Sequence, residues 1–204
     1  MTRFLLPGLV VALAFALGCG GGDTGPAESA SSRTAEGWTL FGDGDYEDAV
    51  AKFERAIELD NSYAEAYSGL GWCYANMNML EEALDNFGRA IDGNPHETVL
   101  ADAYAGSSPV YRDADTRPAH FDSAAAYADS ALSIDRFYKF DYDTTFNWQD
   151  LHLIMAQSYF QLQEYGLAKA RVDSLGGKSL DPGSPTFVDS LAAEIERLET
   201  LHGG

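Results

Sequence analysis

The sequence predicts an all-α protein, built as a solenoid of about four helical pairs with a capping helix at its C-terminal end. Three observations lead to this prediction. Two segments, 37–61 and 71–95, align without gaps at a spacing of 34 residues. Small and aromatic residues recur at fixed offsets in both segments, as they do in helical repeats. Two looser copies then carry the pattern on to residue 175.

The chain begins with a targeting pattern. Residues 1–18 hold one positive charge, an apolar run and small residues before Cys19, as in a secretory signal peptide. The "ALGC" end resembles the signal of bacterial lipoproteins, in which this cysteine is lipidated. The resemblance implies an exported protein, anchored through Cys19 in the cell envelope, with an outer-membrane location favoured because Gly20 follows. An ordinary secretory signal with an incidental cysteine is the alternative.

Residues 19–35 follow the proposed lipidation site. They contain mainly Gly, Ser, Ala, Thr and charged residues, and they show no apolar periodicity. This composition predicts a flexible tether between the anchor and the folded body.

The second repeat has a characteristic row of residues: Tyr67, Leu70, Gly71, Tyr74, Ala83, Phe87, Ala90 and Pro95. This row resembles the tetratricopeptide repeat (TPR), a pair of helices with small residues where the helices cross. The resemblance implies a TPR-type helical-hairpin solenoid over residues 36–175, with a concave groove that holds segments of protein partners. No Lys lies on a predicted first helix, which disfavours a partner's terminal carboxylate as the ligand.

The two later repeats are irregular. The third pairs a helix near 98–106 with one over 121–136, so the sequence predicts an inserted loop over 107–120. The fourth covers 151–175, after a second insertion over 137–148. Both lack the large aromatic residue that the first two repeats place on their second helices.

The stretch "FGDGDYEDAV" at 41–50 raises the question of a cation site. Asp43, Asp45, Glu47 and Asp48 lie within six positions. The helix dipole favours acidic residues at the start of a helix, and the second repeat has no acids matching Asp43 and Asp45. The stretch therefore predicts an acidic turn between two helices, and we expect no metal.

A final helix is predicted over 184–201. Phe187, Leu191, Ile195 and Leu198 recur at helical spacing, with acidic residues on the other face. A polar outer side is what the terminal unit of a solenoid requires.

The composition argues against several functions. The formal net charge of −19 disfavours nucleic acids and anionic lipid headgroups as ligands. The four histidines have no metal-ligand spacing, there is no phosphate-binding glycine loop, and Cys73 stands alone among apolar residues. We therefore expect neither an enzyme nor a cofactor.

Two surfaces are candidates for partner binding. The first is the groove, where the family resemblance places the following residues: Trp38, Phe41, Ser68, Trp72, Asn76, Gln157 and Phe160. The second is the aromatic insertion, with the following side chains: Phe137, Tyr138, Phe140, Tyr142, Phe146 and Trp148. For the tryptophans, the alternative is that the insertion or a neighbouring helix covers them. For the insertion, the alternative to an interaction patch is packing on the solenoid.

Taken together, these features predict an exported scaffold, tethered to a membrane, that mediates protein–protein interactions in a cell-envelope or surface complex. The alternative is a structural subunit that self-associates end to end into an extracellular filament, because a contact between unlike ends does not close.

Overall fold

The computed structural model describes residues 28–114 and 116–202, which form nine helices and no β-strand. The all-α repeat solenoid predicted from the sequence is confirmed. In chain order the helices are α1 (Ala30–Asp43), α2 (Tyr46–Leu59), α3 (Ala64–Asn76), α4 (Leu80–Asp92), α5 (Glu97–Ala114), α6 (Pro118–Ile134), α7 (Trp148–Gln161), α8 (Tyr165–Ser174) and α9 (Phe187–His202).

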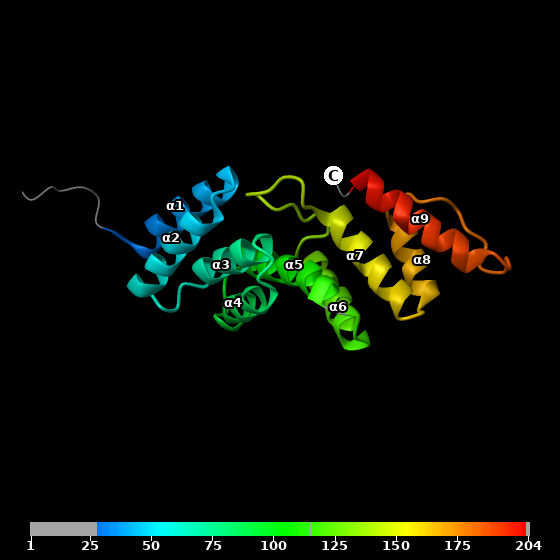
Figure 1. Cartoon of the computed structure of the whole chain (residues 1–204), viewed down its shortest axis with the longest axis horizontal. Coiled ribbons are helices and arrows are strands. Elements are labelled where there is room, and N and C mark those ends of the chain that lie inside the picture. The colour runs from blue at the N-terminus through cyan, green and yellow to red at the C-terminus, as the bar shows by residue number, and fades with distance from the viewer. Residues whose placement is uncertain (1–27, 115, 203–204) are drawn as a thin grey trace, which may run out of the picture.

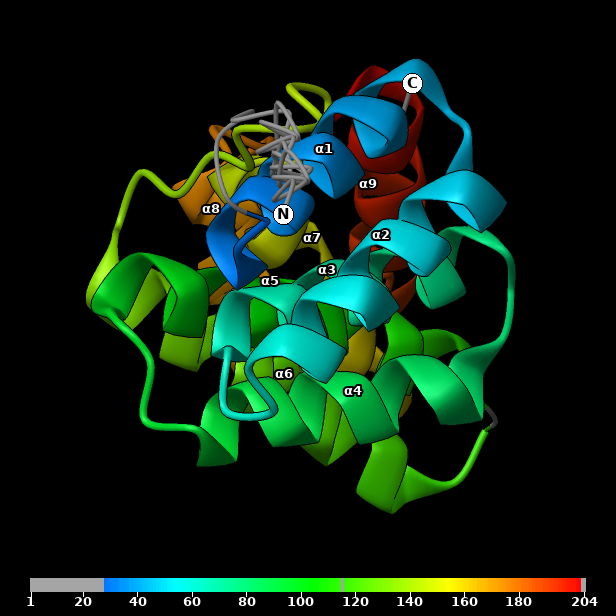
Figure 2. The same cartoon turned by 90° about the vertical axis from the view of Figure 1, so that its left-hand side faces the viewer.

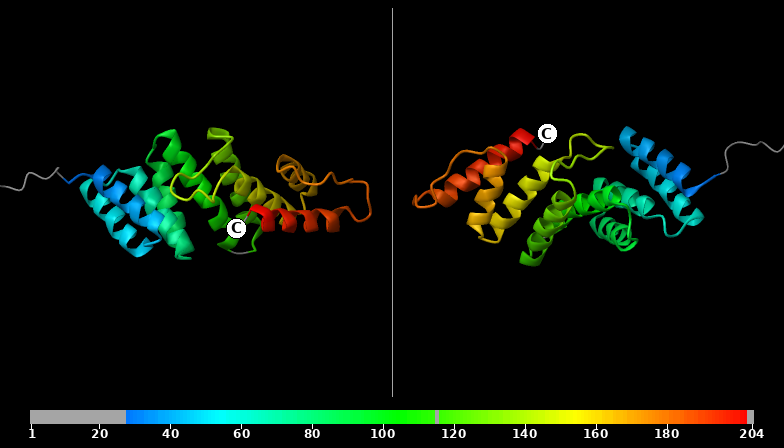
Figure 3. Two further views of the ribbon diagram at one scale, coloured as in Figure 1. Left: turned by 90° about the horizontal axis from the view of Figure 1, so that it is seen from above. Right: turned by 180° about the vertical axis from the view of Figure 1, so that it is seen from behind.

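Consecutive helices form four pairs that stack into an arch (Figure 1). Helices α1, α3, α5 and α7 lie on its concave side, and α4 and α6 lie on the opposite side (Figure 1). Figure 2, seen from the α1–α2 end, shows the later pairs stacked behind the first. Helix α9 packs on α7 and α8 at the far end, and the curvature is clearest in the right-hand view of Figure 3.

Two phenylalanines fix the distance between neighbouring pairs. Phe53 of α2 and Phe87 of α4 are fully buried. A β-carbon on Gly37 would lie 2.7 Å from the Phe53 ring, and one on Gly71 would lie 2.5 Å from the Phe87 ring. Each ring also reaches the next first helix, where a β-carbon on Gly69 would overlap Phe53. The repeat therefore needs glycine on α1 and α3 because each aromatic ring fills the space between three helices.

The prediction of an inserted loop over 107–120 was wrong, since α5 continues through most of it to Ala114. Pro109 lies inside this helix and cannot donate a hydrogen bond to the Ala105 carbonyl. The Ser108 hydroxyl donates to that carbonyl instead, at 2.9 Å. This replacement bond satisfies the carbonyl and allows the helix to pass a proline that the sequence reading took for a loop residue.

Both ends of the described chain differ from prediction by a few residues. The predicted tether over 19–35 is too long, because α1 begins at Ala30, where Ser29 and Ser32 form a capping box. The capping helix begins at Phe187 and not at 184. The proposed lipidation site and residues 1–18 lie outside the described residues.

The acidic stretch at 41–50 is a turn, as predicted. Helix α1 ends at Asp43, Gly44 adopts the left-handed conformation with φ of 84°, and α2 begins at Tyr46. Gly44 is suited to this φ because it has no side chain. Within residues 28–114 and 116–202, no cluster of His, Cys, Asp and Glu side chains could hold a metal ion.

We expect Gly69→Ala to lower the free energy of unfolding by about 1–3 kcal/mol, because the new methyl group would displace the buried Phe53 ring. Gly88→Ala is the matched control, since a β-carbon there would meet no atom within 4 Å. That variant should gain about 1 kcal/mol from helix propensity. Urea unfolding of both variants measures the difference, and equal stabilisation by the two would contradict the packing described above.

Candidate functional site

The linker between α6 and α7 enters the concave face of the arch. We call residues 135–147 the aromatic strap. The strap folds back on itself, with the Phe140 N–H donating to the Phe146 carbonyl at 3.1 Å and an isolated bridge between Lys139 and Asn147. In Figures 1 and 3 this loop reaches from the start of α7 towards α1.

The strap stacks on both groove tryptophans. The Tyr142 ring lies parallel to Trp38, with centroids 4.0 Å apart and planes inclined by 2°. The Phe140 ring stacks on Trp72 at 4.1 Å and 17°. Phe146 contacts the same Trp72 edge-on at 5.4 Å. The strap thus covers the N-terminal half of the groove with an aromatic layer.

Four of the seven predicted groove residues are therefore buried, which corrects the expectation that their side chains are exposed in the groove. Trp38 and Phe41 are each 4% exposed, Trp72 is 6% exposed and Ser68 is 1% exposed. The alternative, in which the insertion covers the tryptophans, is what the structure has. The other three predicted residues remain accessible: Asn76, Gln157 and Phe160.

Most of the second predicted patch is packed rather than presented to a partner. Phe140 and Tyr138 are buried, and Phe146 and Trp148 are half-buried. Tyr142 keeps 37% of its surface exposed because only one ring face meets Trp38. The exception is Phe137, which is 61% exposed beside the Arg136 guanidinium. Packing on the solenoid, the alternative, therefore holds for Tyr138 and Phe140, and for the other four residues the interaction patch stays a prediction.

Phe140→Ala should lower the free energy of unfolding by about 3–5 kcal/mol, because it removes a fully buried ring that contacts both tryptophans. Phe137→Ala, in the same strap, should change that value by no more than about 0.5 kcal/mol. Thermal and urea unfolding of the two variants provide the comparison. Similar small losses in both would mean that the strap does not belong to the core.

One hydrogen bond anchors the base of the strap. The Tyr138 hydroxyl donates to the Asp102 carboxylate on α5 at 2.9 Å. Burial, helped by the negative charges of Asp141 and Glu65, raises the pKa of Asp102 to about 7, although the bond from Tyr138 opposes this. Near neutral pH, the strap is therefore anchored on a carboxyl group that is partly protonated.

Because the pKa of Asp102 is higher in the folded chain than its ordinary 3.8, this group favours folding in its protonated form. Its contribution is complete below about pH 4 and is lost as the pH rises towards about 7. Asp102→Asn keeps an acceptor for Tyr138 and should stabilise the chain by about 1–3 kcal/mol near pH 8, and by less near pH 5. Urea unfolding at both pH values tests this; a gain that does not change with pH would contradict it.

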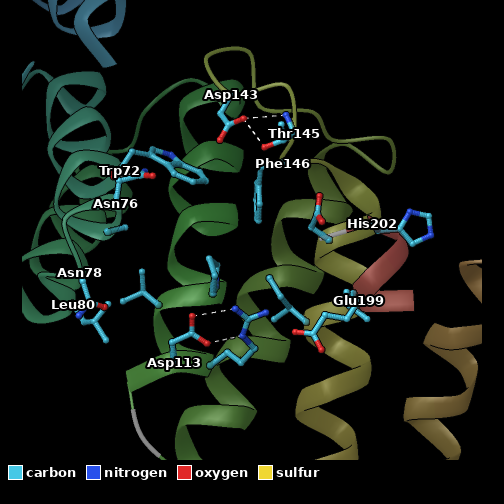
Figure 4. A pocket seen from close by; sticks show the side chains of 17 residues that line it. Trp72, Asn76, Asn78, Leu80, Asp113, Asp143, Thr145, Phe146, Glu199 and His202 are labelled. Carbon is cyan, nitrogen blue, oxygen red and sulfur yellow. Dashed lines mark hydrogen bonds and ion pairs between the residues drawn. The ribbon is translucent and has the colours of Figure 1, made fainter. Parts of the chain in front are cut away.

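An open cleft begins where the strap ends. It has a volume of about 420 Å³ and lies between α3, the start of α4, α5, the strap, α7 and α9. Figure 4 shows side chains from these elements around one hollow. Its polar lining residues are Asn76, Asn78, Arg112, Asp113, Asp143, Thr145, Asp150, Glu199 and His202. Its apolar wall consists of Trp72, Ala75, Leu80, Pro109, Val110, Phe146, Leu153 and Ile154.

The cleft is acidic. The Arg112 guanidinium binds the Asp113 carboxylate through two contacts of 2.7 and 3.0 Å, and it also donates to Gln157 at 3.1 Å. Asp143 accepts bonds from the Thr145 N–H and hydroxyl at the tip of the strap.

The far wall of the cleft adds two more carboxylates. Asp150 accepts the Asn147 N–H at 2.8 Å, and burial raises its pKa. Glu199 on α9 forms no hydrogen bond or ion pair with the residues that the structure describes. The lining thus holds four carboxylates and a single guanidinium.

A smaller hollow of about 200 Å³ lies between α7 and α9. It is lined by Gln157, Phe160, Gln161, Ala192, Ile195, Glu196 and Glu199. Glu199 lines both spaces; of the predicted groove residues, Asn76 lines the cleft, and Gln157 and Phe160 line the smaller hollow.

The two hollows are lined by several carboxylates and amides, and Cys73 lies outside both. Cys73, the free cysteine of the described chain, is fully buried, and its burial raises the thiol pKa to about 12, so the thiolate needed for reaction is not formed. The acidic cleft residues carry acceptors for hydrogen bonds and ion pairs with a bound segment.

Sequence reasoning did not identify the cleft. Its acidic residues lie on elements far apart in the chain, and only the docking of α9 against α7 brings Glu199 and His202 towards Asp113. The one available signal was the acidic face of the capping helix, which the sequence reading assigned to solvent.

The comparisons with known proteins agree with this architecture. Residues 40–105 match the tetratricopeptide repeat family. No curated protein matches the chain. Among solved structures, a MamA protein is similar with a TM-score of 0.53 and 22% identity, covering 85% of this chain and 76% of its own.

Two further structures have the same fold. YrrB, described as a TPR protein with an unusual peptide-binding site, has a TM-score of 0.60 and 18% identity, covering 85% of this chain and 88% of its own. A thermophilic TPR protein of Thermus thermophilus has a TM-score of 0.52 and 21% identity, covering 85% of this chain and 83% of its own. The match over residues 40–105 and the shared fold together support a tetratricopeptide-repeat protein.

Proposed function

We propose that this protein is an exported scaffold, anchored in a cell-envelope membrane through Cys19, that binds a segment of a protein partner in the acidic cleft. The observation that carries the binding role is the cleft itself, which is open between α3, the start of α4, α5, the strap, α7 and α9. A volume of about 420 Å³ is within the range of sites that bind small ligands or a few side chains.

The fold supports the scaffold role. TPR solenoids present a concave surface to protein partners, and here the strap covers the N-terminal half of that surface. A partner therefore has access to the part of the concave face beyond the strap, where Asn76 is exposed and Gln157 and Phe160 are partly exposed.

The sequence supports export and anchoring. Its first 19 residues carry the signal and the cysteine that resemble those of a lipoprotein. Among the helices of the described residues, none is both long and apolar enough to cross a bilayer. In this proposal the lipid on Cys19 supplies the attachment to the membrane, together with any second signal that stable anchoring requires.

To test the proposal, we would purify the tagged full chain from detergent-solubilised membranes of its own cells and identify co-purifying proteins. Asn76→Trp should remove them, because a large side chain at this exposed position fills the cleft. Trp38→Ala and Trp72→Ala cannot test partner binding, because both side chains belong to the hydrophobic core and their removal would destabilise the fold.

Two controls accompany this measurement. Glu81→Trp places the same side chain on the exposed face of α4, outside the cleft, and should leave the partners in place. Cys19→Ala should move the protein out of the membrane fraction. Partners that remain with Asn76→Trp would refute the cleft as the binding site, and membrane attachment of Cys19→Ala would refute the anchor.

A further inference from the structure

Resting on the proposed function, we infer that the partner segment is basic: it carries at least two Lys or Arg side chains next to an apolar or aromatic one. The first argument is the charge of the cleft. Asp143, Asp150 and Glu199 face it from three different elements, and none of them forms an ion pair within the described part of the chain. The partners of Asp143 and Asp150 are uncharged donors, namely Thr145 and Asn147.

The geometry of these acids favours side chains over a bound ion. No three His, Cys, Asp or Glu side chains among the described residues come close enough together to hold a metal. One cation therefore cannot satisfy the cleft, whereas a segment with several basic side chains can reach separate carboxylates. An ammonium or guanidinium group that binds a partly buried carboxylate makes a charge-assisted hydrogen bond, which is stronger than a neutral one.

Two further polar groups at the cleft are free to form a hydrogen bond with a bound segment. The indole N–H of Trp72 and the Nε2 atom of His202 are buried and have no hydrogen-bond partner within the described residues. Trp72 also forms part of the apolar wall of the cleft. A peptide backbone has both donors and acceptors, so a bound segment that shifts these side chains slightly could satisfy both groups.

The apolar position follows from the smaller hollow. Phe160 and Ile195 lie in its wall, and Glu196 and Glu199 lie beside them. Glu199 belongs to both spaces, so a segment that pairs with Glu199 can place its neighbouring side chain against Phe160. A basic residue next to an apolar one has the chemistry that matches this arrangement, while a second copy of this acidic chain does not.

The test uses the immobilised full chain in detergent and a soluble library of randomised hexapeptides. We expect the retained peptides to be enriched in Lys and Arg, and to hold an apolar or aromatic residue beside them. The most enriched peptide should bind several-fold more weakly at about 300 mM salt than at about 50 mM, because salt screens charge pairs.

Charge reversal provides the matched comparison. Glu199→Lys should weaken the binding of that peptide by about fivefold, the size expected for the loss of an exposed charge pair. Glu81→Lys changes the net charge by the same amount at an exposed position outside the cleft and should have little effect. Equal weakening by the two variants would attribute binding to overall charge and would overturn the inference.

The remaining outcomes separate this inference from the proposed function. Retained peptides without basic residues, or no retained peptides, overturn the inference; the scaffold role still stands if Asn76→Trp removes the co-purifying partners. Partners that persist with Asn76→Trp refute the cleft itself. Self-association of the wild type that Asn76→Trp abolishes, measured by sedimentation, would identify a second copy as the occupant and would also overturn the basic segment.

Discussion

The stacking of Phe140 on Trp72 and of Tyr142 on Trp38 determines which part of the concave face is open. These two strap residues are two positions apart, and the tryptophans that they contact are one repeat of 34 residues apart. A short segment therefore spans two repeats and joins the first helical pair to the linker before α7. The aromatic layer covers this half, so the open part of the concave face, where we propose that a partner binds, lies between α3, α5, α7 and α9.

The first two repeats could be predicted because their determinants are local. Gly71 and Phe87 lie 16 positions apart in one helical pair, and their contact follows from the repeat pattern alone. The extent of α5 could not be predicted in this way. Pro109 normally ends a helix, and its tolerance depends on the Ser108 hydroxyl binding the Ala105 carbonyl, which is a specific side-chain geometry and not a periodicity.

The candidate site, like the fold, could be predicted only in part. Sequence reasoning placed Trp38 and Trp72 on the groove side and treated the aromatic linker as a separate surface. In the sequence, the tryptophans and the aromatic linker each lacked an apolar partner, and in the structure they pack against each other. Asp113 and Glu199 come together only through the docking of α9 on α7. The spacing of residues in the sequence does not predict this proximity, because it depends on where the linker between α8 and α9 places the last helix.

The position of the cleft also bears on how an anchored molecule would meet its partner. Helix α1 begins 11 residues after Cys19, and a chain of that length spans at most about 40 Å when fully extended. With Cys19 in the membrane, as proposed, the α1–α2 end of the arch is therefore held near the bilayer. The cleft is lined by residues from α3, α5, α7 and α9, and α7 and α9 lie towards the end of the arch opposite α1 and α2 (Figure 1). The covered half of the arch then acts as a spacer, and the acidic cleft can face a basic segment away from the membrane surface.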